Sequence, residues 1–372
     1  MKFSYIAVIK AALLLVSFNA HSGLIDLSNV GYVQYGDGQS YSLPIAQIQD
    51  GCTSPGCPFY VPSTPGHIKD LVVVATGASG TDVNTNYAGM DNAYATPSGV
   101  SGSNFFSTGT ETDPNQLSNF FGDSTDTWDT TLAALNGYLL GDDMIFMFNN
   151  NNLNGANLQS LAAWMQITLT DDQGQVFSVY DFTNNNSKYD LVSEGGGGTF
   201  LGDVTSYTSD GSGPDGGTND DTDYVLSGGP LCINTDGLVP VPVPCDGSGL
   251  LPVSQGPVNH NLGADEVAYA VLFPELNDEL FSLFSNLSAQ EMMSYTMNID
   301  LRLGCDPLLF SNDAEDELCS GALSGFGKNL NNGYEQLFIA TSTRLAQIPE
   351  PSTLMIFLTS TFILISRKRK GL

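Results

Sequence analysis

Three side chains with hard oxygen ligands, at alternate positions, form the sharpest candidate metal site in the sequence. Asn219, Asp221 and Asp223 have the spacing of the first ligands in an EF-hand calcium loop. That motif also needs a glycine and a bidentate glutamate further on, where this chain has Tyr224 and Pro230. A solvated acidic loop is therefore the favoured interpretation, and calcium is the only cofactor that we consider.

Histidines with serines could support nucleophilic catalysis, and paired carboxylates could hydrolyse sugars. His67 lies near Asp70 in the sequence, and His260 lies near Asp265. The chain contains no Gly-x-Ser-x-Gly motif, no His-Glu-x-x-His motif and no phosphate-binding loop. Solvated loop histidines are the simpler interpretation, so we predict that the chain is not an enzyme.

The charged residues are distributed unevenly along the chain. The 372 residues have a formal net charge of −29, and 41% of them are hydrophobic, which is enough for a sizeable core. Residues 23–346 contain 5 basic residues and 39 of the 40 acidic ones, so their net charge is −34. Such a body repels nucleic acid and anionic lipid and attracts cations. We therefore expect no nucleic-acid partner.

The N-terminal residues 1–22 have the organisation of a secretory signal peptide. Lys2 and Lys10 supply a positive first region, and residues 11–18 supply an apolar run. Small residues precede the expected cleavage point after Ser22. We therefore predict export through the secretion translocon and removal of the leader by a signal peptidase.

The C-terminal end, residues 347–372, has three parts in a fixed order. They are the motif Pro349, Glu350 and Pro351, an uncharged apolar run over about 353–366, and the basic cluster Arg367, Lys368, Arg369 and Lys370. A helix over the apolar run would span about 22 Å, which is shorter than the roughly 30 Å hydrocarbon core of a bilayer. Bilayer thinning and snorkelling basic side chains can compensate for that difference. Four cations after an apolar run hold that end of a membrane helix in the cytoplasm.

This three-part end resembles the PEP-CTERM sorting domain of exosortase substrates, which occur in Gram-negative bacteria that make extracellular polysaccharide. The resemblance implies that an exosortase, a membrane-embedded cysteine transpeptidase, recognises Pro349, Glu350 and Pro351. It also implies a transient anchor in the inner membrane, with residues 367–370 as the stop-transfer cluster. The final location would then be the cell surface or the extracellular matrix. Proline cannot continue a helix, so the motif should be extended and accessible to a protease.

Six cysteines in a chain with a signal peptide favour disulfides over a metal site. No Cys-x-x-Cys spacing occurs, and few histidines are available as further zinc ligands. The simplest pairing joins neighbours in the sequence. It gives Cys52 with Cys57, Cys232 with Cys245, and Cys305 with Cys319.

Short β-like runs recur between turn residues in the body, and several of them alternate apolar and polar residues, as half-buried strands do. Nine runs have this character: 30–35, 41–48, 71–76, 143–148, 164–170, 176–182, 267–273, 295–303 and 336–341. Residues 130–140 and 275–287 instead carry apolar side chains at helical spacing, and Gly141 can end the first of these helices. Many short strands between Gly, Asn and Asp turns predict a mainly β fold. We expect an antiparallel β-sandwich or jelly roll with two short helices.

Residues 193–262 interrupt the strand pattern with glycines, prolines and acidic residues. We interpret them as a loop-rich insertion in one extracellular domain, residues 23–346, because strand-like runs of similar type lie on both sides. A boundary between two domains is the alternative.

The expected function is inferred from the predicted export and sorting signals more than from the residues of the body. Such signals are only an indirect argument about activity. We predict a structural or adhesive component of an extracellular polysaccharide matrix, with that polysaccharide as a partner. A glycan-binding module that uses calcium is the alternative, because Trp128, Trp164 and the tyrosines could stack on sugar rings. The amides of residues 149–154 could also face a glycan. A secreted carbohydrate-active enzyme is the second alternative.

Overall fold

The computed structural model describes most of the predicted body. It describes residues 25–77, 83–84, 87–97, 105–109, 111, 114, 120, 122–151, 161–182, 225–226, 231–234, 241–244, 258–263, 265–304, 330 and 335–342. The predicted signal peptide and the predicted sorting domain lie outside these ranges. Within them, no helix is both long enough and apolar enough to cross a membrane.

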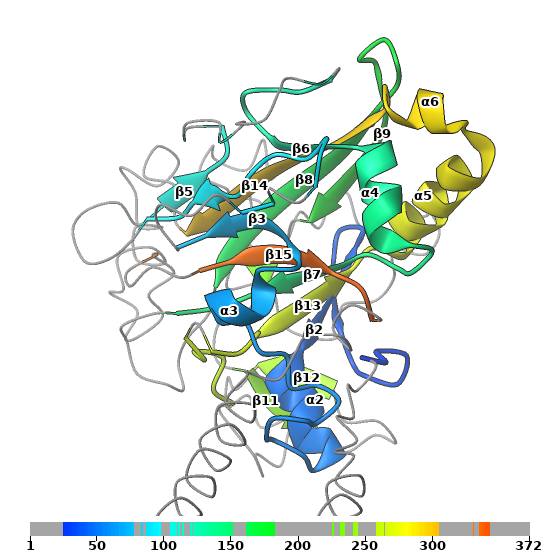
Figure 1. Ribbon diagram of the computed structural model, residues 1–372. Coiled ribbons are helices and arrows are strands. Elements are labelled where there is room, and N and C mark those ends of the chain that lie inside the picture. The colour runs from blue at the N-terminus through cyan, green and yellow to red at the C-terminus, as the bar shows by residue number, and fades with distance from the viewer. Residues whose placement is uncertain are drawn as a thin grey trace, which may run out of the picture.

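Two β-sheets form the framework of the body, and the fold is mainly β (Figure 1). The seven-stranded sheet has the order β1-β2-β13-β7-β15-β3-β4, and the six-stranded sheet contains β10, β8, β14, β5, β6 and β9. A separate pair consists of β11 and β12. The strands are β1 Val33–Tyr35, β2 Gly38–Ser42, β3 Val72–Thr76, β4 Tyr94–Ala95, β5 Phe105–Ser107, β6 Trp128–Thr131, β7 Ile145–Phe148, β8 Ala162–Thr170, β9 Val176–Phe182, β10 Val225–Leu226, β11 Leu231–Asn234, β12 Val241–Pro244, β13 Tyr269–Leu272, β14 Thr296–Gly304 and β15 Leu337–Ala340.

The two sheets pack face to face around the larger hydrophobic core, an arrangement consistent with a β-sandwich (Figure 1). Strand alternation supplies this core, because side chains two residues apart share one face of a strand. In β8, Met165, Ile167 and Leu169 all point inward, as their spacing predicted, and all are fully buried. Each such side chain contributes roughly 1.5–3 kcal/mol through burial.

The outer face of the seven-stranded sheet carries a second, smaller core. Its strand residues alternate with those of the first core, for example Val73 between Val72 and Val74. The N-terminal residues Ile25 and Leu27 cover this face together with residues from the region around α3. The seven-stranded sheet is therefore covered on both faces, and the first described residues of the chain form part of the cover.

Eight of the nine predicted strand runs match a strand of the structure, and β9 has the predicted bounds. The strands β4, β5, β6, β10, β11 and β12 had no predicted run, and the last three lie within the predicted loop-rich insertion. The run 41–48 was wrong, because β2 ends at Ser42 and helix α2 (Leu43–Asp50) follows. Pro44 lies in the first helical turn, where its missing N–H is not needed, and the Ser42 hydroxyl accepts a hydrogen bond from the Ile45 N–H. The chain leaves the helix at Gly51 in the left-handed conformation.

Both predicted helices are present, as α4 (Leu132–Leu139) and α5 (Pro274–Asn286). The left-handed cap of α4 is Leu140 and not Gly141, which follows it. The expectation of two helices was too low, because α2, α3 (Pro65–Ile68) and α6 (Ala289–Met292) are also helical. The expectation of purely antiparallel sheets was also wrong at one edge, where β3 and β4 run parallel.

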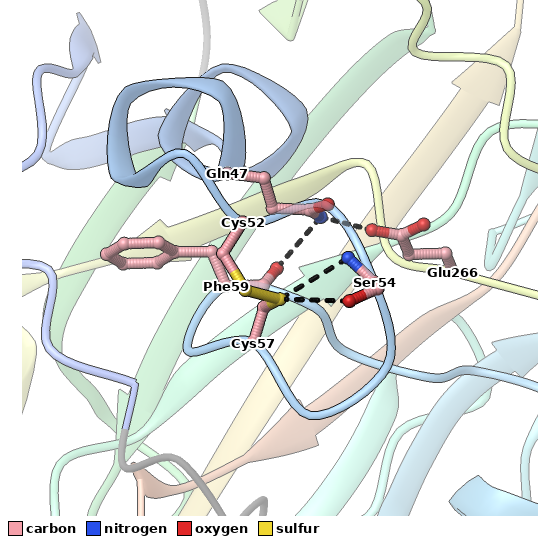
Figure 2. Close-up of a disulfide and its surroundings, with 6 residues drawn as sticks. All are labelled: Gln47, Cys52, Ser54, Cys57, Phe59 and Glu266. Atoms are coloured by element: carbon pink, nitrogen blue, oxygen red, sulfur yellow. Dashed lines mark hydrogen bonds between the residues drawn. A yellow bond between two sulfur atoms is a disulfide. The ribbon is translucent and has the colours of Figure 1, made fainter.

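One predicted disulfide, Cys52–Cys57, is present just after α2 (Figure 2). Ser54 lies inside the closed loop, and its N–H and hydroxyl both lie within hydrogen-bonding distance of the Cys57 sulfur. The Gln47 side chain donates to the Phe59 carbonyl at 3.2 Å and to the Glu266 carboxylate. These contacts fix the loop against the segment that leads into β13. Cys232 lies on β11, and Cys245, Cys305 and Cys319 lie outside the described residues, so the other two pairings remain predictions.

Candidate functional site: a tyrosine-lined pocket

A pocket of about 480 Å³ lies on the outer face of the seven-stranded sheet and is partly open to solvent. The N-terminal segment 25–32 forms one wall, and strands β2, β13 and β7 form the floor. The lining residues are Ile25, Asp26, Leu27, Ser28, Val30, Tyr32, Gln39, Tyr41, Asp143, Ile145, Leu272 and Ser342. We call this site the tyrosine pocket.

Strand register places the floor of the tyrosine pocket. Gln39 on β2 pairs with Leu272 on β13, and Leu272 pairs in turn with Ile145 on β7. Paired residues point to the same face of a sheet, so these three side chains form one row across three strands. Tyr41 lies two residues along β2 from Gln39 and therefore shares that face.

Two tyrosine rings line the pocket, the half-buried Tyr32 and the buried Tyr41. The ring centroids of Tyr32 and Tyr41 are 5.4 Å apart, and the ring planes are tilted by 52°. The Tyr41 hydroxyl donates to Oε1 of Gln39 at 2.7 Å, which fixes the ring against the floor. Burial raises the pKa of Tyr41, and the neighbouring Tyr32 adds to the effect. The Tyr41 hydroxyl therefore stays protonated near neutral pH.

Two exposed carboxylates contribute to the lining of the pocket. Asp26 accepts a hydrogen bond from the N–H of Ser28 at 3.0 Å, and Asp143 lies just before β7. The Ser28 side chain and then its backbone N–H lower the pKa of Asp26, because they stabilise the charged form. No Lys, Arg or His belongs to the lining described above. The pocket thus combines apolar and aromatic surface with acceptors and hydroxyl groups.

A second group of carboxylates lies at β6, with Asp91 and Asp129 buried and Asp123 half-buried. Asp91, Asp123 and Asp129 each have an oxygen within 4.8 Å of the others, an arrangement that could hold a cation or share a proton. We call these residues the buried aspartate cluster. Burial raises the pKa of Asp129 to about 7, although several hydrogen bonds oppose that shift. Asp91 is far from Asp123 and Asp129 in the sequence, so no spacing motif could have predicted the cluster.

Hydrogen bonds within the protein already occupy Asp129. Its carboxylate accepts from the Thr127 hydroxyl at 2.5 Å, the Asn298 amide at 2.7 Å and the Ser124 N–H at 2.5 Å. The Asp129 N–H in turn donates to the Asp91 carboxylate at 2.8 Å. The simplest role for these contacts is to hold the segment before β6 against β14.

The two histidines considered for catalysis both have hydrogen-bond partners, and the expectation of solvated loop histidines was wrong for His260. His260 is buried and stacks on Tyr269, and its Nε2 lies 2.7 Å from the Ser42 hydroxyl. Its Nδ1 bonds to the carbonyl of Val258, so a carbonyl takes the place that a triad gives to a carboxylate. Burial lowers the pKa of His260 to about 4. His67 bonds to the Thr64 hydroxyl at the start of α3.

The tryptophans considered for sugar stacking belong to the interior. Trp128 is completely buried, and the guanidinium of Arg302 covers the ring of Trp164 at 4.5 Å. Asn149 and Asn150 are also buried, and Asn149 donates to the Ser63 hydroxyl at 2.8 Å. These side chains are therefore not available for sugar contacts, and residues 152–154 lie outside the described residues. Sequence reasoning pointed to tyrosines in general and missed Tyr32 and Tyr41 in particular.

Several predicted site residues lie outside the described residues. They are the calcium candidates Asn219, Asp221 and Asp223, the sorting motif Pro349, Glu350 and Pro351, and the basic cluster Arg367, Lys368, Arg369 and Lys370. The structure therefore leaves the calcium loop and the sorting signal as predictions.

Comparison with known proteins places the chain in one family. No curated protein and no solved structure matches the chain. One family matches residues 25–302, a range that begins with the wall of the tyrosine pocket and ends within β14. The chain therefore belongs to the family described as Domain of unknown function (DUF8239).

Proposed function

We propose that this chain is an exported protein of the bacterial cell surface or extracellular matrix, and that it adheres to polysaccharide through the tyrosine pocket. The observation that carries the adhesive role is the composition of the pocket. Tyr32 provides an accessible aromatic ring that contacts the buried Tyr41, and five polar residues share the lining with them. The site is concave, mostly apolar and equipped with a few polar groups, as small-molecule sites generally are.

A sugar ring has one chemistry on its faces and another on its rim. The C–H faces are apolar and pack well on an aromatic ring, whereas the hydroxyls need donors and acceptors. In the tyrosine pocket, Asp26, Asp143 and Gln39 can accept hydrogen bonds, and the hydroxyls of Ser28 and Ser342 can both donate and accept. The volume of about 480 Å³ is in the usual range for a ligand of this size.

We propose binding and not hydrolysis at this pocket. A glycosidase needs a carboxyl group with a raised pKa as its general acid. The pKa of Asp26 is lowered, because Ser28 stabilises its charged form. Asp129 and Glu335, whose pKa values burial raises, do not belong to the lining.

The two ends of the sequence support the surface location. A leader-like N-terminus, a Pro-Glu-Pro motif, an apolar run and a basic end occur in the order that export and exosortase processing would require. The Cys52–Cys57 disulfide suits an oxidising compartment. We further propose that the two sheets form a jelly-roll-like sandwich, an architecture that lectin domains also use, although fold likeness alone is an indirect argument.

A binding measurement tests the adhesive role. The full chain is screened on a glycan array with and without a calcium chelator, and the best ligand is then titrated by calorimetry. We expect Tyr32→Ala to weaken binding about tenfold, because it removes one aromatic face. Phe281→Ala, which removes an exposed aromatic ring of α5 outside the pocket, is the matched control. Equal binding by Tyr32→Ala and wild type would exclude the tyrosine pocket as the site.

The surface location has its own test. The intact mass of the protein recovered from the native host should lack residues 1–22 and everything beyond the Pro349 region. Persistence of the C-terminal end on all of the protein would exclude exosortase processing and would leave the pocket proposal untouched.

A further inference from the structure

We infer that the tyrosine pocket selects sugar units that carry a protonated amine over neutral and acidic sugars. This inference rests on the proposed function and names the class of ligand. Asp26 and Asp143 contribute two negative charges to the lining, and no lining residue is basic. The pocket therefore combines the negative charge of a cation-binding site with a tyrosine-containing wall.

Both carboxylates of the pocket are accessible to a ligand. Asp26 and Asp143 are both exposed, so a ligand can approach either carboxylate. The hydrogen bond that Ser28 gives to Asp26 orients the carboxylate and also favours its charged form. The surrounding body has 5 basic residues and 39 acidic ones over residues 23–346, so its long-range field also attracts cations.

The tyrosines add a second attraction for an ammonium group. A cation within about 6 Å of an aromatic ring centroid is attracted by the negative face of the ring. Tyr32 is the more accessible ring, and the buried Tyr41 lies beside it with a centroid distance of 5.4 Å and a tilt of 52°. An ammonium group carries three donors and no acceptor, which matches a lining rich in carboxylate and hydroxyl oxygens.

The same features discriminate against two common sugar types. Acetylation of the amine removes its charge and therefore its attraction to Asp26 and Asp143. A uronic acid places a third carboxylate among these two, and like charges at close range repel each other. A unit charge about 4 Å away in water changes affinity about fivefold, so each aspartate should contribute a preference of about that size.

The experiment compares three oligosaccharides of matched length by calorimetry at low salt, using the full chain in a mild detergent. They are an oligomer of glucosamine, its fully N-acetylated form and a uronic acid oligomer. We expect the glucosamine oligomer to bind at least about tenfold more tightly than the acetylated form, and the uronic acid oligomer to bind weakest. Added salt should reduce this preference, because it screens exposed charges.

Variants locate the preference in the pocket. Asp26→Asn and Asp143→Asn should each lower the ratio of the two affinities, glucosamine oligomer over acetylated oligomer, about fivefold. Asp278→Asn, which removes an equally exposed charge from α5, is the matched control and should leave that ratio unchanged.

The outcomes separate this inference from the proposed function. Equal affinity for the glucosamine and acetylated oligomers would overturn the preference for amines and would leave sugar binding intact. A preference that persists in the double variant Asp26→Asn/Asp143→Asn would assign it to the acidic surface and would also overturn the inference. Absence of binding to all three oligomers would contradict the proposed function itself.

Discussion

Two groups of aspartates in this body differ in what surrounds them. Asp26 and Asp143 are exposed in the lining of the tyrosine pocket, whereas Asp91 and Asp129 are almost completely buried next to Asp123. Hydrogen bonds from Ser28 lower the pKa of Asp26, while burial raises the pKa of Asp129 to about 7. At neutral pH the Asp26 carboxylate is therefore ionised, whereas the Asp129 carboxyl group is protonated in about half of the molecules.

The comparison shows why the number of acidic residues says little about function. The oxygens of Asp129 are committed to Thr127, Asn298 and Ser124, so this carboxyl group mainly stabilises the scaffold. Asp26 faces solvent with only local contacts. A ligand can reach the exposed carboxylate, and the fold depends on the buried one. Each prediction below tests one side of that contrast.

The largest expected effect is the loss of stability when the buried Asp129 is removed. Asp129→Ala removes the acceptor of three hydrogen bonds and leaves buried donors unsatisfied. We expect the free energy of unfolding to fall by about 3 kcal/mol, measured by urea denaturation. Asp126→Ala, an exposed aspartate of the same segment, is the control and should change little. A loss below about 1 kcal/mol for Asp129→Ala would mean that Asp129 does not support the scaffold.

The next effect is a dependence of stability on pH. The pKa of Asp129 is about 7 in the folded protein and near the ordinary value of 3.8 in the unfolded chain. Between these values the folded state holds a proton that the unfolded state has lost, so this group's contribution to stability falls as pH rises. Below about pH 4 both states are protonated and the contribution is fully present.

Comparison of wild type with Asp129→Asn isolates that contribution. Glu335, with its pKa raised by burial to about 8, acts in the same direction, while His260, with its pKa lowered to about 4, acts in the opposite one. Both are present in wild type and variant, so their effects cancel in the difference. We expect wild type to lose stability relative to Asp129→Asn between about pH 4 and about pH 7. A difference that does not vary with pH would show that Asp129 stays ionised.

The strands could be predicted from the sequence because their signal is local. This applies to eight strands, of which β9 was located without error, whereas β4, β5, β6, β10, β11 and β12 had no predicted run. The ninth run failed at Pro44, where a capped helix replaced the expected strand. The Cys52–Cys57 disulfide was predictable for the same reason, because both cysteines lie in one short loop.

The tyrosine pocket could not be predicted because its residues meet through register and not through spacing. Gln39, Leu272 and Ile145 form one row only because β13 lies between β2 and β7. The buried aspartate cluster also joins distant segments. A sequence reveals which residues could bind a ligand or a cation, but the pairing of strands decides which of these residues lie close together.

The smallest expected effect is the change in stability when the exposed Asp26 is removed. Asp26→Ala should change the free energy of unfolding by no more than about 0.5 kcal/mol, because its carboxylate is exposed and its contacts are with the neighbouring Ser28. The lowered pKa of Asp26 gives the sign of this contribution. It is present above the unfolded pKa and is lost as pH falls through the folded pKa, which is opposite to Asp129. Urea denaturation near neutral pH and below about pH 4 measures both points. A loss as large as that of Asp129→Ala would show that segment 25–32 depends on Asp26 for its place over the sheet, and the contrast between the two groups would then fail.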